Sequence, residues 1–233
     1  MNDKRVLAII PARAGSKRLP RKNILMLQGK PLIQWTIDEA LKSNVIDTIA
    51  VSTDDTEIID LSVSLGLNVP FVRPEFLSGD KSSSIDVIKH AIDYYQSVGD
   101  KYDYVMLLQP TSPLRTAKHI DEAFQLLESK DAEAVVSVCE CEHSPLWSNT
   151  LPDDLSMDNF IPENIKNKRS QDLGTFYRLN GAIYIAKIDA FLKENALLLS
   201  NRCVAYKMST EESVDIDERI DFLLADAILR GNE

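Results

Sequence analysis

The chain has 233 residues, of which 26 are basic and 36 acidic, so its formal net charge at pH 7 is -10. This length suits one large α/β domain over 1–233, and the acidic balance argues against non-specific binding to nucleic acid, whose affinity comes mostly from phosphate neutralisation. No stretch is long enough to span a membrane and no secretory pattern is present, so we expect three reduced thiols in a cytoplasmic protein.

The first predicted element is a strand over 6–10, where a continuous apolar run indicates burial on both faces. Pro11 has no N–H to donate, so we expect the strand to end there and open into a loop. That loop carries five basic residues, namely Arg13, Lys17, Arg18, Arg21 and Lys22. Cations at the carboxyl end of a buried strand favour a phosphate site over a solvated basic loop. The loop has neither P-loop nor G-x-G-x-x-G spacing, so side chains would hold the phosphates.

Strands and amphipathic helices then alternate along the chain. We predict helices over 32–43, 56–65, 85–95 and 116–130, and strands over 48–52, 68–72, 104–108 and 134–138. This alternation predicts right-handed βαβ units and a mostly parallel sheet. Ligands bind such sheets at the carboxyl ends of the strands. We therefore expect the cationic loop, Thr53-Asp54, the polar loop 77–84 and Gln109 to line one crevice.

The alternation stops after Cys139. The segment 140–175 has little periodicity and contains three prolines, and a structureless loop of this length is unusual in a compact domain. We interpret it as a lid or as an arm that packs on a partner chain. Beyond it we predict strands over 177–186 and 203–208 and helices over 189–194 and 218–230.

Asp215 and Asp217 stand two residues apart in an extended stretch, so their side chains should project from the same face. Two hard carboxylates suit a magnesium ion that also contacts substrate phosphates. The alternative is that Asp217 only caps the last helix. The cationic loop favours the metal site, because nucleotidyl transfer needs both features.

Two further clusters have weaker interpretations. Cys139, Cys141 and His143 could share a strand face, but no fourth zinc ligand lies nearby in the sequence, and core thiols explain them better. Arg169 and Arg178, near the amides of Gln171 and Asn180, could bind a carboxylate in a forked geometry or simply form surface ion pairs.

Four motifs in order, at 8–23, 107–115, 178–184 and 215–217, resemble those of the CMP-sialic acid synthetases, also called acylneuraminate or nonulosonate cytidylyltransferases. The resemblance covers nearly the whole chain. It implies the nucleotide-diphospho-sugar transferase fold, a Rossmann-like three-layer α/β/α sandwich. It also implies a homodimer in which the protruding segment 140–175 covers the neighbour's sugar site.

The implied reaction joins CMP from CTP to the anomeric hydroxyl of a nine-carbon 2-keto sugar acid and releases pyrophosphate. By position in the motifs, Arg13, Lys17, Lys22 and Asp217 would carry catalysis, and Mg²⁺, or Mn²⁺ in its place, would bind Asp215 and Asp217. The CTP-binding residues would be Ala12, Arg13, Lys17, Lys22, Arg73 and Ser84. The sugar-binding residues would be Gln109, Arg169, Gln171, Arg178 and Asn180.

Relatives that activate legionaminic or pseudaminic acid share most of these motifs, so the resemblance leaves the particular nonulosonic acid open. A second enzyme class is the 3-deoxy-manno-octulosonate cytidylyltransferases, which share the Pro-Ala-Arg loop but match less well at Gln109 and Asn180. An alternative of another kind is a non-catalytic regulator that binds CTP or the sugar. The presence of the aspartate pair and the loop lysines argues against the regulator.

Overall fold

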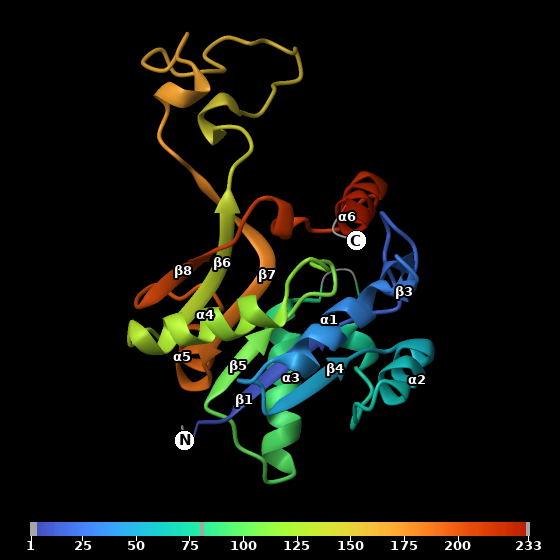
Figure 1. The fold of residues 1–233 in the computed structure, drawn as a ribbon. Helices are drawn as coiled ribbons and strands as arrows, with labels where there is room; N and C mark the ends of the chain where they lie inside the picture. Colours follow the sequence, from blue (N-terminus) through green and yellow to red (C-terminus); the bar gives the residue numbers. More distant parts are fainter. Residues whose placement is uncertain (1–3, 80–81, 232–233) are drawn as a thin grey trace.

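The computed structural model describes residues 4–79 and 82–231 of the chain. Its centre is a six-stranded sheet in the order β4-β1-β5-β7-β6-β8 (Figure 1). The strands are β1 (Val6–Pro11), β4 (Thr48–Ser52), β5 (Tyr104–Leu107), β6 (Ala134–Glu140), β7 (Tyr177–Lys187) and β8 (Cys203–Lys207). A two-stranded hairpin, β2 (Met26–Leu27) and β3 (Lys30–Pro31), lies apart from it.

The sheet is mostly parallel, as predicted. β1 pairs in parallel with both β4 and β5, and β6 pairs in parallel with β8. β7 is the exception, because it runs antiparallel to both of its neighbours, β5 and β6. Pro11 is the last residue of β1, at the point where the sequence predicted the strand to end.

Helices cover both faces of the sheet and give three layers. Alternate residues of β1 face opposite layers. One set packs with α1 (Leu32–Lys42), α2 (Thr56–Ser64) and α4 (Ala117–Ser129). The other set packs with α3 (Ser84–Ser97) and α5 (Ile188–Glu194) (Figure 1). The predicted α/β/α sandwich is therefore confirmed.

One predicted element is wrong. The segment 68–72 forms no strand, although the backbone N–H of Arg73 donates to the carbonyl of Thr53 at 2.8 Å. Pro70 lies within this segment and Pro74 follows Arg73, so two residues lack the N–H that a ladder beside β4 would need. Of the polar loop 77–84, residues Asp80 and Lys81 lie outside the described part of the chain.

The segment between β6 and β7 leaves the body of the molecule as an arm (Figure 1). Its regular structure consists of two 3-10 turns, Pro145–Trp147 and Ser170–Asp172. The chain then returns through β7 and β8 to the last helix, α6 (Arg219–Gly231), whose buried Ala225 joins a small core with Leu32 and Ile216. Among the described residues, we find no helix that is long and apolar enough to cross a membrane.

Candidate active site

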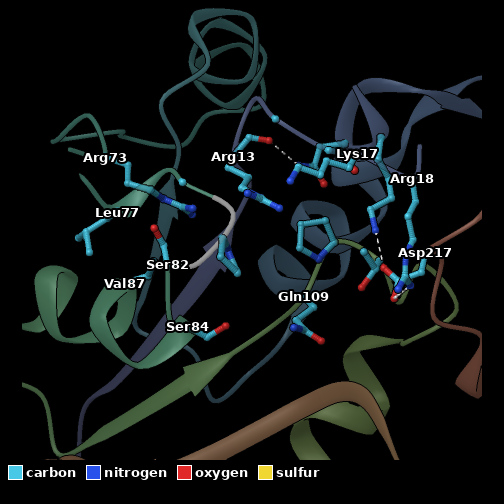
Figure 2. A pocket seen from close by; sticks show the side chains of 18 residues that line it. Arg13, Lys17, Arg18, Arg73, Leu77, Ser82, Ser84, Val87, Gln109 and Asp217 are labelled. Carbon is cyan, nitrogen blue, oxygen red and sulfur yellow. Dashed lines mark hydrogen bonds and ion pairs between the residues drawn. The ribbon is translucent and has the colours of Figure 1, made fainter. Parts of the chain in front are cut away.

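A cavity of about 490 Å³ opens at the carboxyl ends of β1 and β5. Its walls come from the cationic loop after β1, from Arg73, Leu77, Gly79 and Ser82, from the first turn of α3 and from the loop after β5 (Figure 2). The structure thus brings together three of the four segments that the sequence placed at one crevice. The fourth, Thr53-Asp54, supports the site from behind, because Asp54 Oδ1 accepts from the backbone N–H of Ala14 at 2.9 Å.

The cationic loop gives the cavity its positive wall. Arg13, Lys17, Arg18 and Lys22 all line it, beside the small residues Gly15 and Ser16. Asn23 holds the loop closed, because its Nδ2 donates to the carbonyl of Arg13 at 3.1 Å. Ala12 is fully buried at the base of the loop, where its N–H donates to Ser52 at 2.9 Å.

Lys22 joins this wall to the far end of the chain. Its Nζ donates to the carbonyl of Ile216 at 2.6 Å and to Asp217 Oδ1 at 2.9 Å. The Lys22 side chain is only 12% exposed, whereas that of Asp217 is 57% exposed and lines the cavity. The start of α6 is satisfied by Asp221, whose Oδ2 accepts from the N–H groups of Asp217 and Glu218 at 3.0 and 2.7 Å. The Asp217 carboxylate therefore faces cations and is not used as the helix cap.

Asp215 is less exposed than Asp217. Its segment is tied to the loop after β5, because the Ile216 N–H donates to the Thr111 carbonyl at 2.8 Å. Burial raises the pKa of the Asp215 carboxyl, and the nearby charge of Asp217 raises it further, against a lowering effect of a hydrogen bond from Thr111. Its Oδ1 is buried without a hydrogen-bond partner. A buried carboxylate oxygen without a donor is costly, so this position suits a cation.

The opposite end of the cavity has fewer charged side chains and more apolar ones. Arg73, Leu77, Ser84 and Val87 line it, with Arg13 and Gln109 between this end and Asp217 (Figure 2). Arg73 is 5% exposed, and burial lowers the pKa of its guanidinium to about 10. Its Nε donates to Ser52 Oγ at 3.0 Å and one Nη to the Ser52 carbonyl. This end can receive a flat heterocycle between apolar side chains and fixed donors.

The residues predicted to bind the sugar lie at four places. Gln109 lines the cavity. Arg178, on β7, donates to Glu142 at 2.8 Å and lines a neighbouring hollow of about 440 Å³ that also contains Asp215. Arg169 and Gln171 are exposed on the arm, where Arg169 pairs with Asp172 at 3.0 Å.

Asn180 is 1% exposed, and both ends of its amide bond protein groups. Its Oδ1 accepts from Ser137 Oγ at 2.6 Å, and its Nδ2 donates to Ser213 Oγ at 2.9 Å. Ser213 stands two residues before Asp215. The structure therefore places Asn180 beneath the site, where it links β6 and β7 to the segment that carries the aspartates.

Sequence reasoning assigned no role to Thr111, Asn23 or Arg115. Thr111 bonds the largely buried Asp215, and Asn23 supports the cationic loop. Arg115 is fully buried beneath the loop after β5. The only signal in the sequence was their position inside or just after the motifs, because each acts through a contact with a residue distant in the chain.

Comparison with known proteins identifies the family of the chain. The family model described as "Cytidylyltransferase" matches residues 7–222, and the chain belongs to that family. It is 41% identical over 219 residues to an N-acylneuraminate cytidylyltransferase of Streptococcus agalactiae serotype V, covering 93% of this chain and 51% of the relative. It is 37% identical over 235 residues to the CMP-N,N'-diacetyllegionaminic acid synthase of Legionella pneumophila, covering 98% of both chains.

A third relative is the pseudaminic acid cytidylyltransferase of Campylobacter jejuni, which is 34% identical over 226 residues and 97% of both chains. The solved structure of a CMP:2-keto-3-deoxy-manno-octonic acid synthetase complexed with CTP has a TM-score of 0.71 at 16% identity, covering 99% of this chain and 100% of that one. This likeness shows the fold. The chain spans about half the length of the streptococcal relatives that it matches.

Proposed function

We propose that the protein transfers CMP from CTP to the anomeric hydroxyl of a nonulosonic acid and releases pyrophosphate. One observation carries the proposal, namely that Lys22 brings the cationic loop to within 2.9 Å of Asp217, 195 residues away in the chain. A cavity with cations along one wall and a carboxylate pair at one end suits a metal-bound triphosphate. The names of the relatives at 34–41% identity support a nine-carbon sugar acid as the acceptor.

The aspartate pair fits Mg²⁺, with Mn²⁺ as a substitute. Asp215 supplies a buried oxygen without a donor, and Asp217 supplies an exposed carboxylate beside it. Among the described residues, no group of three or more histidines, cysteines or acids could hold a metal. The triphosphate would therefore provide the remaining ligands, as is usual for magnesium. When bound there, the ion neutralises negative charge on the phosphates.

The chain's own residues then account for the transfer. Arg13, Lys17 and Lys22 bind the triphosphate and stabilise the charge that develops on the departing pyrophosphate. Arg73, Ser84 and the backbone near Ala12 fix the cytidine end. Gln109, between the two ends, orients the sugar acid so that its C2 hydroxyl attacks the α-phosphate in line. Arg18 and Asp217 line the cavity at the end away from Arg73 (Figure 2). There Arg18 would add positive charge beside the triphosphate, and Asp217 would ligate the metal.

The test is pyrophosphate release from CTP with a panel of acceptors. The panel contains N-acetylneuraminate, N,N'-diacetyllegionaminate, pseudaminate and 3-deoxy-manno-octulosonate, each with and without Mg²⁺. We expect release that depends on Mg²⁺ and on one of the three nine-carbon acids. Release with the eight-carbon acid alone would reassign the protein to the octulosonate enzymes. CTP binding without release from any acceptor would favour a regulator.

We also propose that the active form is a homodimer in which each arm reaches the partner's sugar site. The arm exposes Leu151, Leu155 and Met157 at 55, 71 and 60%, which is a substantial apolar surface for a segment outside the core. Arg169 is not among the residues that line the described cavity of its own chain. An arm exchanged between protomers would bury these side chains and bring Arg169 to a sugar carboxylate.

Subunit mixing tests this arrangement. Arg169→Ala and Lys22→Ala should each be nearly inactive as homodimers. The first lacks the basic side chain that the arm would bring to the sugar, and the second lacks a lysine that would bind the triphosphate. After subunit exchange, one intact site per heterodimer should restore about a quarter of the unmodified activity. Light scattering should report a dimer for each of the two variants and for their mixture after exchange. A monomer at working concentration, or no recovery after exchange, would contradict the shared site.

A further inference from the structure

Arg115 is a charged residue in the interior of the protein, and no carboxylate of the described residues forms an ion pair with it. Its side chain is 1% exposed, and burial lowers the pKa of the guanidinium to about 9. The acid whose charge acts on it is Glu39, which itself accepts from the Ala117 N–H at 2.8 Å and pairs with Lys42 at 2.7 Å. Burying an unpaired cation is expensive, and an apolar residue of similar volume would fold at lower cost. The guanidinium therefore needs an explanation other than stability.

Its hydrogen bonds connect three elements at one point. One Nη donates to the Gln109 carbonyl at 3.1 Å and to the Ala182 carbonyl at 2.8 Å. The other Nη donates to Thr36 Oγ1, on α1, at 2.7 Å. The antiparallel ladder between β5 and β7 ends at the pair Leu107–Tyr184, just before these carbonyls. Arg115 thus supplies N–H donors where the sheet no longer does, and its planar fork can hold both carbonyls at once.

The residues held in this way lie directly under the site. Gly181 precedes Ala182 and has φ +75°, in a stretch where the register of β7 against β6 shifts. A Cβ placed on Gly181 would lie 2.8 Å from Gln109 Oε1 and 3.3 Å from Asp215 Oδ2. The side-chain amide of Gln109 and the carboxylate of Asp215 therefore meet over Gly181. One cation fixes the backbone on both sides of that meeting point.

We propose that Arg115 is a positioning residue that sets the placement of the Gln109 amide relative to Asp215, and through it the affinity for the acceptor sugar acid. The inference rests on the proposed function and deepens it. Arg115 is not among the described residues that line the candidate active-site cavity, so its effect passes through the carbonyls of Gln109 and Ala182. The nucleotide end, built on Arg73 and α3, does not depend on these bonds.

The experiment compares Arg115→Lys and Arg115→Met with the unmodified protein, using CTP and the best acceptor of the panel. We expect KM for the sugar acid to rise about 10-fold for the lysine variant and about 100-fold for the methionine variant, the size of effect that a misplacement of about 1 Å produces. The Kd for CTP, measured by calorimetry without acceptor, should stay within about 2-fold. Partial rescue by lysine distinguishes a donor role from a packing role.

A double-mutant comparison makes the assignment specific. In a Gln109→Ala background, Arg115→Lys should have little further effect on KM for the sugar acid, because the amide that it positions is gone. Arg202→Lys, at the other end of the sheet, serves as the matched arginine control and should leave both constants unchanged. If the position-115 variants do not fold, Thr36→Val, which removes one acceptor of the guanidinium, should raise the same KM to a smaller extent.

Parallel loss of CTP binding and sugar-acid affinity, or full additivity with Gln109→Ala, would show a merely structural Arg115 and overturn the inference. Unchanged constants in folded Arg115→Met would overturn it as well. These outcomes differ from failure of the proposed function, in which the unmodified protein releases no pyrophosphate with any acceptor of the panel.

Discussion

Asp217→Ala is expected to lower the rate of pyrophosphate release by about 10³-fold, because in the proposed reaction its carboxylate would hold the metal beside the triphosphate, a contribution worth several kcal/mol in the transition state. The fold should survive. The Asp217 side chain is 57% exposed, and its pair with Arg18 at 3.9 Å lies at the surface, where such pairs contribute at most about 1 kcal/mol. Lys22, whose side chain is 12% exposed, keeps its hydrogen bond to the Ile216 carbonyl at 2.6 Å. Steady-state kinetics and a thermal melt of the same sample measure the two effects separately.

Asp60→Ala provides the control, because Asp60 is an exposed carboxylate on α2. It removes the same charge from the same chain, so any difference between the two variants reflects position and not net charge. Near-normal turnover in Asp217→Ala would remove this residue from the metal site. A comparable loss in Asp60→Ala would point to a general electrostatic effect on CTP binding.

Asp215→Asn is expected to abolish activity and yet to stabilise the protein in the absence of ligands. Asp215 is largely buried, its Oδ1 has no partner, and its pKa is raised first of all by burial. An amide keeps the shape and removes the buried charge, so the free energy of unfolding at neutral pH should increase. In a domain of this size, each kcal/mol gained raises Tm by about 2–4 °C.

The pH dependence of this gain has a definite sign. Because the folded-state pKa of Asp215 is raised, the acid favours folding below its unfolded pKa and loses that contribution as the pH rises through the folded pKa. The difference in Tm between Asp215→Asn and the unmodified protein should therefore be small near pH 4 and should grow toward pH 7. Other carboxylates titrate in both proteins and cancel in the difference.

Adding Mg²⁺ with CTP should reverse the order of the two melting temperatures, because the unmodified protein offers the cation two carboxylates whereas the variant keeps only that of Asp217 and should bind the ion more weakly. Asp60→Asn is the matched control, because it makes the same substitution at an exposed carboxylate on α2. An Asp215→Asn protein that melts lower at neutral pH would mean that the carboxylate is stabilised in the folded state, and the fit to a cation would fail.

Much of the fold followed from local patterns. The strand over 6–10 was predictable because a strand buried on both faces is continuously apolar, and the helices because their apolar residues recur with helical spacing. The segment 68–72 failed because Pro70 and Pro74 matter only in relation to a neighbouring strand, which the pattern of apolar residues does not reveal. The antiparallel direction of β7 was equally hidden, since a strand buried between two others looks the same in either direction.

For the site, the sequence by itself determined the chemical components. Arg13, Lys17 and Lys22 follow a buried strand, and Asp215 and Asp217 alternate in an extended stretch, so residue types and spacing indicated phosphate and metal chemistry. The resemblance of the four motifs then pointed to the cytidylyltransferases, and the match over 7–222 confirms that family.

Only the tertiary structure decided how these components meet. Lys22 and Asp217 are joined across 195 residues, and Asn180 turned inward to hold Ser213 at 2.9 Å. Arg115 became a buried cation under Gln109, which no spacing rule predicts. The physical reason is that burial and partner choice depend on contacts between distant segments, whereas residue type and periodicity report only what each segment offers. The first loop therefore forms one side of the site, and the segment just before the last helix forms the other side.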